Sequence, residues 1–194
     1  MVSFLVTATY LPWLLFAWLT FETIWDLRDR RIPLWFSLFM LIPGIILLGL
    51  DSWRTAILII LSLVFTEVRN SNPSLGLAGM VGSAVLIPVV SPALWPLAAG
   101  WWGLMLLWSL GVLGGADALA GLSLLLFFPS WKMLDALAAG ILTWGLLMLL
   151  LRYGRKAGLR LWVVASTRAR GAKAAGLGAY ALAALFYALA RIRG

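Results

Sequence analysis

Long apolar runs, interrupted only by short polar segments, occupy almost the whole of this 194-residue chain. Apolar residues make up 63% of the sequence and charged residues 11%, whereas soluble globular domains have roughly 45–50% and about 25%. A globule of this size could not bury so much hydrocarbon, and a disordered chain would need low hydrophobicity and high charge. The sequence therefore predicts a protein embedded in a lipid bilayer.

Eight of the apolar runs are candidates for membrane-spanning helices, because a hydrocarbon core about 30 Å thick needs about 20 mostly apolar residues. The runs cover residues 1–25, 33–50, 53–68, 75–90, 94–113, 118–128, 133–151 and 174–190. Backbone polar groups in lipid must be paired within the segment, and the alternating pattern of strands is absent. We expect an all-α bundle of about eight transmembrane helices that forms a single domain over residues 1–194.

Basic residues are distributed unequally between the two sides of this predicted topology. With the N-terminus outside, the inner loops 26–32, 67–74, 114–117 and 152–173 hold 11 of the 15 Lys and Arg residues, and the outer segments hold 4. This bias predicts that the inner loops face the cytoplasm, in the inner membrane of a cell. The net charge of +8 then reflects topology and contact with anionic membrane lipid. No interleaving of aromatic and basic residues predicts nucleic-acid binding.

The sequence contains no cysteine and no histidine, which excludes thiolate and imidazole catalysis and the usual zinc and haem sites. Any catalysis would depend on carboxylates, hydroxyls, lysine or arginine, and we expect no cofactor and no metal. Asp26 follows the first predicted span and Asp117 precedes the sixth, so the predicted topology places both on the inner face. An ionisable residue at the edge of a span is costly and is therefore a candidate functional group.

The segments around these two aspartates resemble the motifs of type IV prepilin peptidases, which are membrane aspartic proteases of the GxGD type. Segment 26–33 resembles the part of that family in which an aspartate precedes Ile-Pro-Asn, and segment 114–117 resembles its G-x-G-D motif. The matching residues are Asp26, Ile32, Pro33, Gly114, Gly115, Ala116 and Asp117. With the apolar segments around the second motif, the resemblance covers about 45 residues of the chain.

The resemblance implies an aspartic endopeptidase that removes the short basic leader of prepilin-like or pseudopilin-like proteins at the cytoplasmic membrane surface. Asp26 and Asp117 match the two catalytic aspartates. Two adjacent carboxyl groups share one proton, so such a pair can activate water and protonate the carbonyl oxygen and the leaving amine. The family's cytoplasmic methylation domain has no counterpart in this sequence, and we expect leader cleavage without methylation.

The two catalytic aspartates lie closer together in the sequences of that family than in this chain. We assign the additional residues to an extra helical hairpin at about 53–92. Because a hairpin adds two spans, it leaves Asp117 on the same side of the membrane as Asp26. A single additional span would place the two aspartates on opposite sides.

Structural interpretations of the acidic residues remain open beside the catalytic one. Asp117 could act as the N-cap of the helix that follows, and Asp26 could pair with Arg30, four residues on. Asp29 could share the face of Asp26 or could be a solvated partner of the arginines. Glu22, one turn before Asp26, could tune the protonation of the pair, contact the basic leader or snorkel to the membrane interface.

Two other functions also remain open. Leu34, Ala116 and Leu119 stand where the family has Asn, Gly and commonly Lys, so one alternative is a catalytically inactive homologue that acts as a scaffold for pilin-like proteins. A small proton-coupled transporter that uses Asp117 is the other. Few polar residues lie within the predicted spans, which disfavours the transporter.

Overall fold

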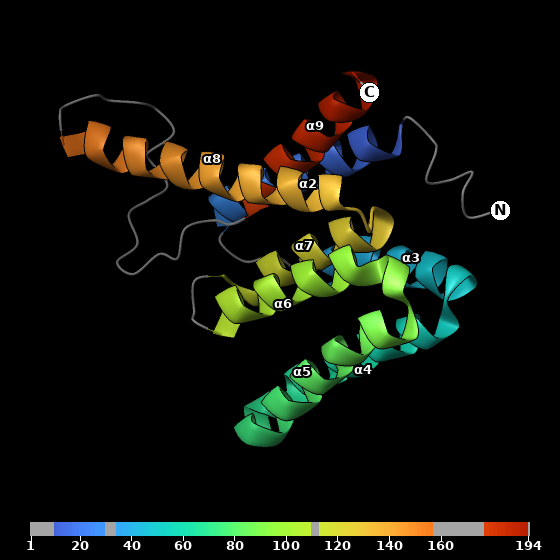
Figure 1. Ribbon diagram of the computed structural model, residues 1–194. Coiled ribbons are helices and arrows are strands. Elements are labelled where there is room, and N and C mark those ends of the chain that lie inside the picture. The colour runs from blue at the N-terminus through green and yellow to red at the C-terminus, as the bar shows by residue number, and fades with distance from the viewer. Residues whose placement is uncertain (1–9, 30–33, 110–112, 157–176, 194) are drawn as a thin grey trace.

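The computed structural model describes residues 10–29, 34–109, 113–156 and 177–193 (Figure 1). Within these ranges the chain is all-helical and contains no strand, which confirms the predicted all-α class. The helices are α2 (Leu11–Asp29), α3 (Leu34–Asp51), α4 (Trp53–Ser71), α5 (Pro73–Val90), the short 3-10 helix η1 (Pro92–Leu94), α6 (Trp95–Ser109), α7 (Gly115–Phe127), α8 (Trp131–Lys156) and α9 (Leu177–Arg193). Each of the eight predicted apolar runs corresponds to one α-helix. None of these helices, over its described residues, is both long enough and apolar enough to cross a membrane.

Several helix boundaries differ from those predicted by hydropathy. α2 continues to Asp29 and α4 to Ser71, so that Asp26 lies on a helix rather than in a loop. α8 likewise continues to Lys156, and the rest of the predicted loop 152–173 lies outside the described residues. Hydropathy locates the end of the apolar run, whereas a helix ends where its backbone hydrogen bonds end, and charged residues can extend a helix by several positions.

The helices run alternately in opposite directions, so the joints between them alternate between two ends of the bundle (Figure 1). Side-chain hydrogen bonds connect the α3–α4 joint to the joint between α5 and η1. Ser52 Oγ lies 2.8 Å from Thr55 Oγ1 and 3.1 Å from Ser91 Oγ, and Thr55 Oγ1 donates to Ser91 Oγ at 3.0 Å. These two joints therefore lie at the same end of the bundle, as the predicted topology requires.

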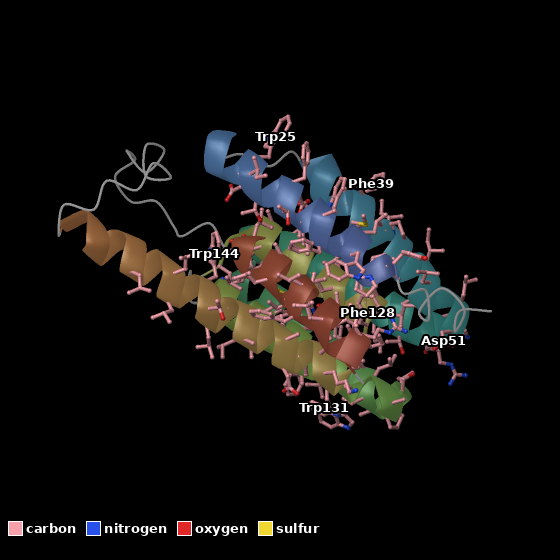
Figure 2. All side chains as sticks on the ribbon, turned by 90° about the horizontal axis from the view of Figure 1, so that it is seen from above. Trp25, Phe39, Asp51, Phe128, Trp131 and Trp144 are labelled. Carbon is pink, nitrogen blue, oxygen red and sulfur yellow. The ribbon has the colours of Figure 1, made fainter. Side chains whose placement is uncertain are left out.

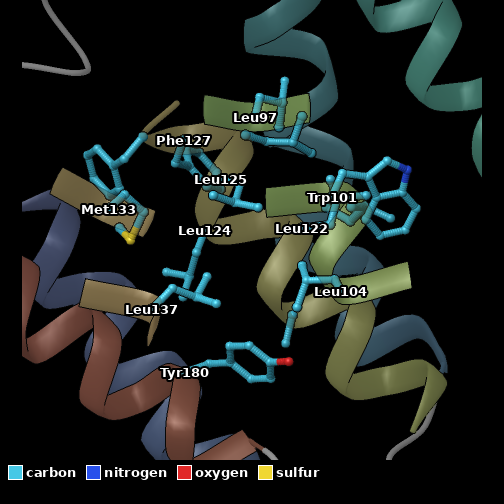
Figure 3. Close-up of a cluster of buried hydrophobic side chains, with 14 of the residues drawn as sticks. Leu97, Trp101, Leu104, Leu122, Leu124, Leu125, Phe127, Met133, Leu137 and Tyr180 are labelled. Atoms are coloured by element: carbon cyan, nitrogen blue, oxygen red, sulfur yellow. The ribbon is translucent and has the colours of Figure 1, made fainter. Parts of the chain in front are cut away.

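α7 is the central helix of the fold. Ten of its 13 residues are buried, and it packs against α3, α6, α8 and α9. Figure 3 shows leucines of α7 between Trp101 and Leu104 of α6 on one side and Met133 and Leu137 of α8 on the other. A helix that is apolar on all sides has no face for water and must be surrounded. The burial of α7 therefore determines where its neighbours lie.

α4 and α5 form a hairpin at the edge of the molecule, where they pack chiefly on each other (Figure 1). A Cβ at Gly79 would overlap the ring of Phe65, and a Cβ at Gly76 would overlap the backbone of Arg69, so both glycines allow close packing. The indole N–H of Trp101 in α6 donates to Ser62 Oγ of α4 at 2.8 Å and attaches the hairpin to the rest of the bundle. The hairpin agrees with the predicted range of about 53–92; its interpretation as an addition to a prepilin-peptidase fold stays a prediction.

Glycine substitutions in α8 test the packing of this helix against α9. A Cβ at Gly140 would overlap the backbone of Ala179 and Ala183, whereas a Cβ at Gly145 would meet no atom within 4 Å. We expect Gly140→Ala to lower the free energy of unfolding by about 1–3 kcal/mol, because the overlapping atoms belong to the backbone. Gly145→Ala is the matched control and should raise this free energy by about 0.5–1 kcal/mol. Thermal unfolding followed by circular dichroism measures both, and equal effects would contradict the observed packing.

Candidate functional site

Asp117 lies in the first turn of α7, where its carboxylate satisfies a backbone donor of the helix start. Its Oδ2 accepts a hydrogen bond from the backbone N–H of Gly114 at 3.0 Å, as in the second half of a capping box. Gly114 is the N-cap residue, so Asp117 caps from the third helical position and not as the N-cap itself. A Cβ at Gly114 would lie 3.1 Å from Oδ2, and glycine leaves room for this contact. Gly115 is exposed, which leaves the backbone beside Asp117 accessible.

Glu22 is the most buried acidic residue among those described, with 1% of its surface exposed. Its carboxylate accepts a hydrogen bond from the side chain of Trp18 and interacts electrostatically with Asp117, which is itself only 9% exposed. Oε1 of Glu22 is buried and has no hydrogen-bond partner among the described residues. The interpretation of Glu22 as a residue that snorkels to an interface is therefore wrong, because its carboxylate points into the bundle and not toward its surface.

Asp26 lies one turn after Glu22 on α2 and is half-buried. Residues four apart share a face of a helix and lie about 6 Å apart along its axis, so Asp26 extends the acidic face of α2 toward the end of that helix. In the described part of the chain, no group of three or more acidic side chains is arranged to hold a metal ion.

The remaining residues of the first motif are placed only in part. Asp29 ends α2, but its side chain is not among those described. Ile32, Pro33 and Arg30, the predicted partner of Asp26, lie outside the described residues. Asp26 is therefore the one motif residue of this segment whose side chain the structure places.

Tyr180 of α9 lies with the buried acidic residues Glu22 and Asp117, and sequence reasoning missed it. It is fully buried, interacts electrostatically with Asp117, and its hydroxyl has no hydrogen-bond partner among the described residues. Figure 3 shows its ring reaching from α9 toward α7 below Leu104. A Cβ at Gly121 would lie 2.9 Å from Tyr180 Cε1, so this glycine of α7 accommodates the ring. The sequence feature that could have identified Tyr180 is its hydroxyl group within the apolar run 174–190. That run contains no recognisable motif.

A cavity lies beside Glu22, where α2, α3 and α7 meet. Its volume is about 10 Å³, which leaves room for about one water molecule. Most of the lining is apolar, but Glu22 of α2, Ser37 of α3 and Ser123 of α7 contribute oxygens, and both serines are buried. Ser123 Oγ donates to the carbonyl oxygen of Leu119 at 2.9 Å, so its lone pairs remain available as acceptors.

The other acidic residues with described side chains lie at the surface. Asp51 ends α3, Glu67 lies on α4 and Asp135 on α8, and all three are exposed. Carboxylates in such positions cost little, because water solvates them. The buried acidic cluster consists of Glu22 and Asp117, with Asp26 at its edge.

Comparison with known proteins identifies no relative of this chain. No family model matches the chain, and neither the curated proteins nor the solved structures contain a significant match. The resemblance to prepilin peptidases rests on the residues of the two motifs alone.

Two substitutions of Asp117 separate its capping role from its charge. Asp117→Ala removes the acceptor for the Gly114 N–H and should lower the free energy of unfolding by about 0.5–2 kcal/mol. Asp117→Asn keeps a side-chain oxygen at the same position and should cost less. Thermal unfolding of the two variants checks this order, and hydrogen exchange at the Gly114 amide should accelerate only in the alanine variant. Equal stability of the wild type and Asp117→Ala would refute the capping role.

Proposed function

We propose that this chain is a membrane-embedded aspartic endopeptidase that cleaves the short basic leader of prepilin-like proteins at the cytoplasmic face. Asp26 and Asp117 are the groups that activate water. The observation that carries the proposal is the interaction of Asp117, at the start of the central helix, with Glu22, which lies one turn before Asp26. Glu22 lies four residues before the first motif and Asp117 lies in the second, so two acidic residues 95 positions apart in the sequence interact electrostatically.

The outer surface of the helices supports a location in the lipid bilayer. Large apolar side chains project outward, among them Phe39, Val89 and Leu142, which are 57%, 71% and 73% exposed. Figure 2 shows Phe39 and Trp131 directed away from the bundle. Large apolar side chains exposed in such number favour contact with lipid or protein rather than water.

Exposed tryptophans at the helix ends support the same location. Trp53, Trp95 and Trp131 are the first residues of α4, α6 and α8, and all three are exposed. By the alternation of the helices, these ends belong to one side of the bundle, the predicted outer side. Indole rings favour the headgroup level, and Trp25, near the end of α2, would occupy that level on the inner side. Together with the basic residues of the predicted inner loops, this arrangement supports the proposal that the acidic residues lie on the cytoplasmic side of a multi-pass inner-membrane protein.

The proposed reaction is the hydrolysis of one peptide bond by water. One aspartate, ionised, takes a proton from water while the water oxygen forms a bond to the scissile carbonyl carbon. The other aspartate, protonated, gives its proton to the carbonyl oxygen. The C–N bond then breaks as the leaving amine accepts a proton, and the pair returns to its shared-proton state. Since titration belongs to the pair, neither aspartate is assigned separately as acid or base.

One observation favours a second function, that of an inactive scaffold for pilin-like proteins. The hydrogen bond from Gly114 to Asp117 gives this aspartate a structural role that needs no catalysis. A scaffold would bind prepilin-like proteins through the same membrane face and would leave their leaders intact.

The deciding experiment measures leader cleavage of a prepilin-like protein in membranes that contain wild-type protein, Asp26→Asn or Asp117→Asn. Asparagine retains the shape of each side chain and, at position 117, the capping oxygen, so that only proton transfer is lost. We expect cleavage to fall by about 100-fold or more in each variant, with unchanged protein levels. Asp135→Asn, at an exposed position of α8, is the control and should cleave normally.

Cleavage that persists in both aspartate variants would exclude the proposed pair. If the wild type binds the substrate without cleaving it, and neither substitution changes this binding, the protein is the scaffold instead.

A further inference from the structure

The polar part of the cavity between α2, α3 and α7 has the features of a binding site. Glu22, Ser37 and Ser123 approach it from three helices, and all three side chains are more than nine-tenths buried. Oε1 of Glu22 has no hydrogen-bond partner among the described residues. Leaving a buried carboxylate oxygen unpaired costs free energy, so an oxygen in this position indicates a partner of complementary charge.

Among the residues that line this cavity, Glu22 is the one with an acidic side chain. Glu22 interacts with Asp117, and both carboxyl groups are buried. The interactions resolved for Glu22 are those with Trp18 and Asp117, and no described basic side chain is among them. Two buried acidic groups that repel each other favour the entry of a positive charge.

We propose that this cavity binds a small monovalent cation of the sodium type, with Glu22 Oε1 and the hydroxyl oxygens of Ser37 and Ser123 as its protein ligands. Carboxylate and hydroxyl oxygens are hard ligands that suit such ions. A divalent ion needs more ligands than these, and no described cluster of three acidic side chains supplies them. Asp117 contributes charge from the first turn of α7.

A cation at this position would hold three helices together. α2, α3 and α7 each provide one oxygen, and α7 is the helix around which the others pack. Binding to the folded chain alone stabilises it in proportion to the logarithm of the ion concentration. This inference is independent of the proposed peptidase activity, because it concerns stability and ion binding only.

The test compares the thermal unfolding of the full chain, purified in detergent, in sodium chloride and in choline chloride of equal ionic strength and pH. Choline is too large for the cavity and serves as the inert cation. We expect Tm to be higher in sodium chloride by about 2 °C or more. Glu22→Gln, Ser37→Ala and Ser123→Ala should each reduce the difference, whereas Asp135→Asn should retain it in full. Line broadening in sodium NMR, lost in Glu22→Gln, gives a direct second readout.

Three results would overturn the proposal. The first is an equal Tm of the wild type in the two salts. The second is a sodium effect that Glu22→Gln and Ser123→Ala both retain, since the ion would then bind elsewhere. The third is a Tm that depends on pH equally in both salts, together with loss of this pH dependence in Glu22→Gln. In that case a proton, and not a cation, would neutralise the carboxylate of Glu22. Should Glu22→Gln fail to fold, the two serine variants carry the same comparison.

Discussion

The fold depends on the enclosure of one short, mostly apolar helix. α7 exposes almost none of its surface, and four other helices surround it. Small residues make the approach possible: a Cβ at Gly44 would lie 3.0 Å from Leu126 Cβ, and a Cβ at Gly100 would lie 2.5 Å from Leu125 Cδ1. Close packing between helices requires such gaps, because side chains in a core interdigitate without voids. The position of α7 thus fixes α3, α6, α8 and α9 around it.

The acidic cluster follows from the same enclosure. Asp117 is drawn into the bundle because it belongs to the first turn of this helix, and its hydrogen bond with Gly114 offsets part of the cost of burial. Glu22 of α2 and Tyr180 of α9 both interact with it electrostatically. Buried polar groups without full hydrogen bonding are costly, and proteins retain them chiefly where they serve a function. The peptidase and the cation site are two separately testable uses of this region.

Sequence reasoning predicted the type and order of the eight α-helices that the described residues form, because uninterrupted apolar runs leave few alternatives. It placed the ends of α2, α4 and α8 too early, since charged residues extended these helices beyond the apolar runs to Asp29, Ser71 and Lys156. Within the site it identified Asp117 as a capping and functional candidate but gave Glu22 only a supporting role. The burial of Glu22 depends on the helices that cover α2, which no local pattern of residues reveals.

The sequence by itself determined the all-α class, the α4–α5 hairpin and the location of acidic residues near helix ends. These features depend on local hydrophobicity and charge. Only the tertiary structure decided that Asp117 interacts electrostatically with Glu22 and Tyr180, and that Ser37 and Ser123 line the same cavity as Glu22. The physical reason is that each of these juxtapositions joins helices far apart in the chain. The packing around α7 sets the rotation of these helices relative to one another. The residue pattern of a single helix does not contain that information.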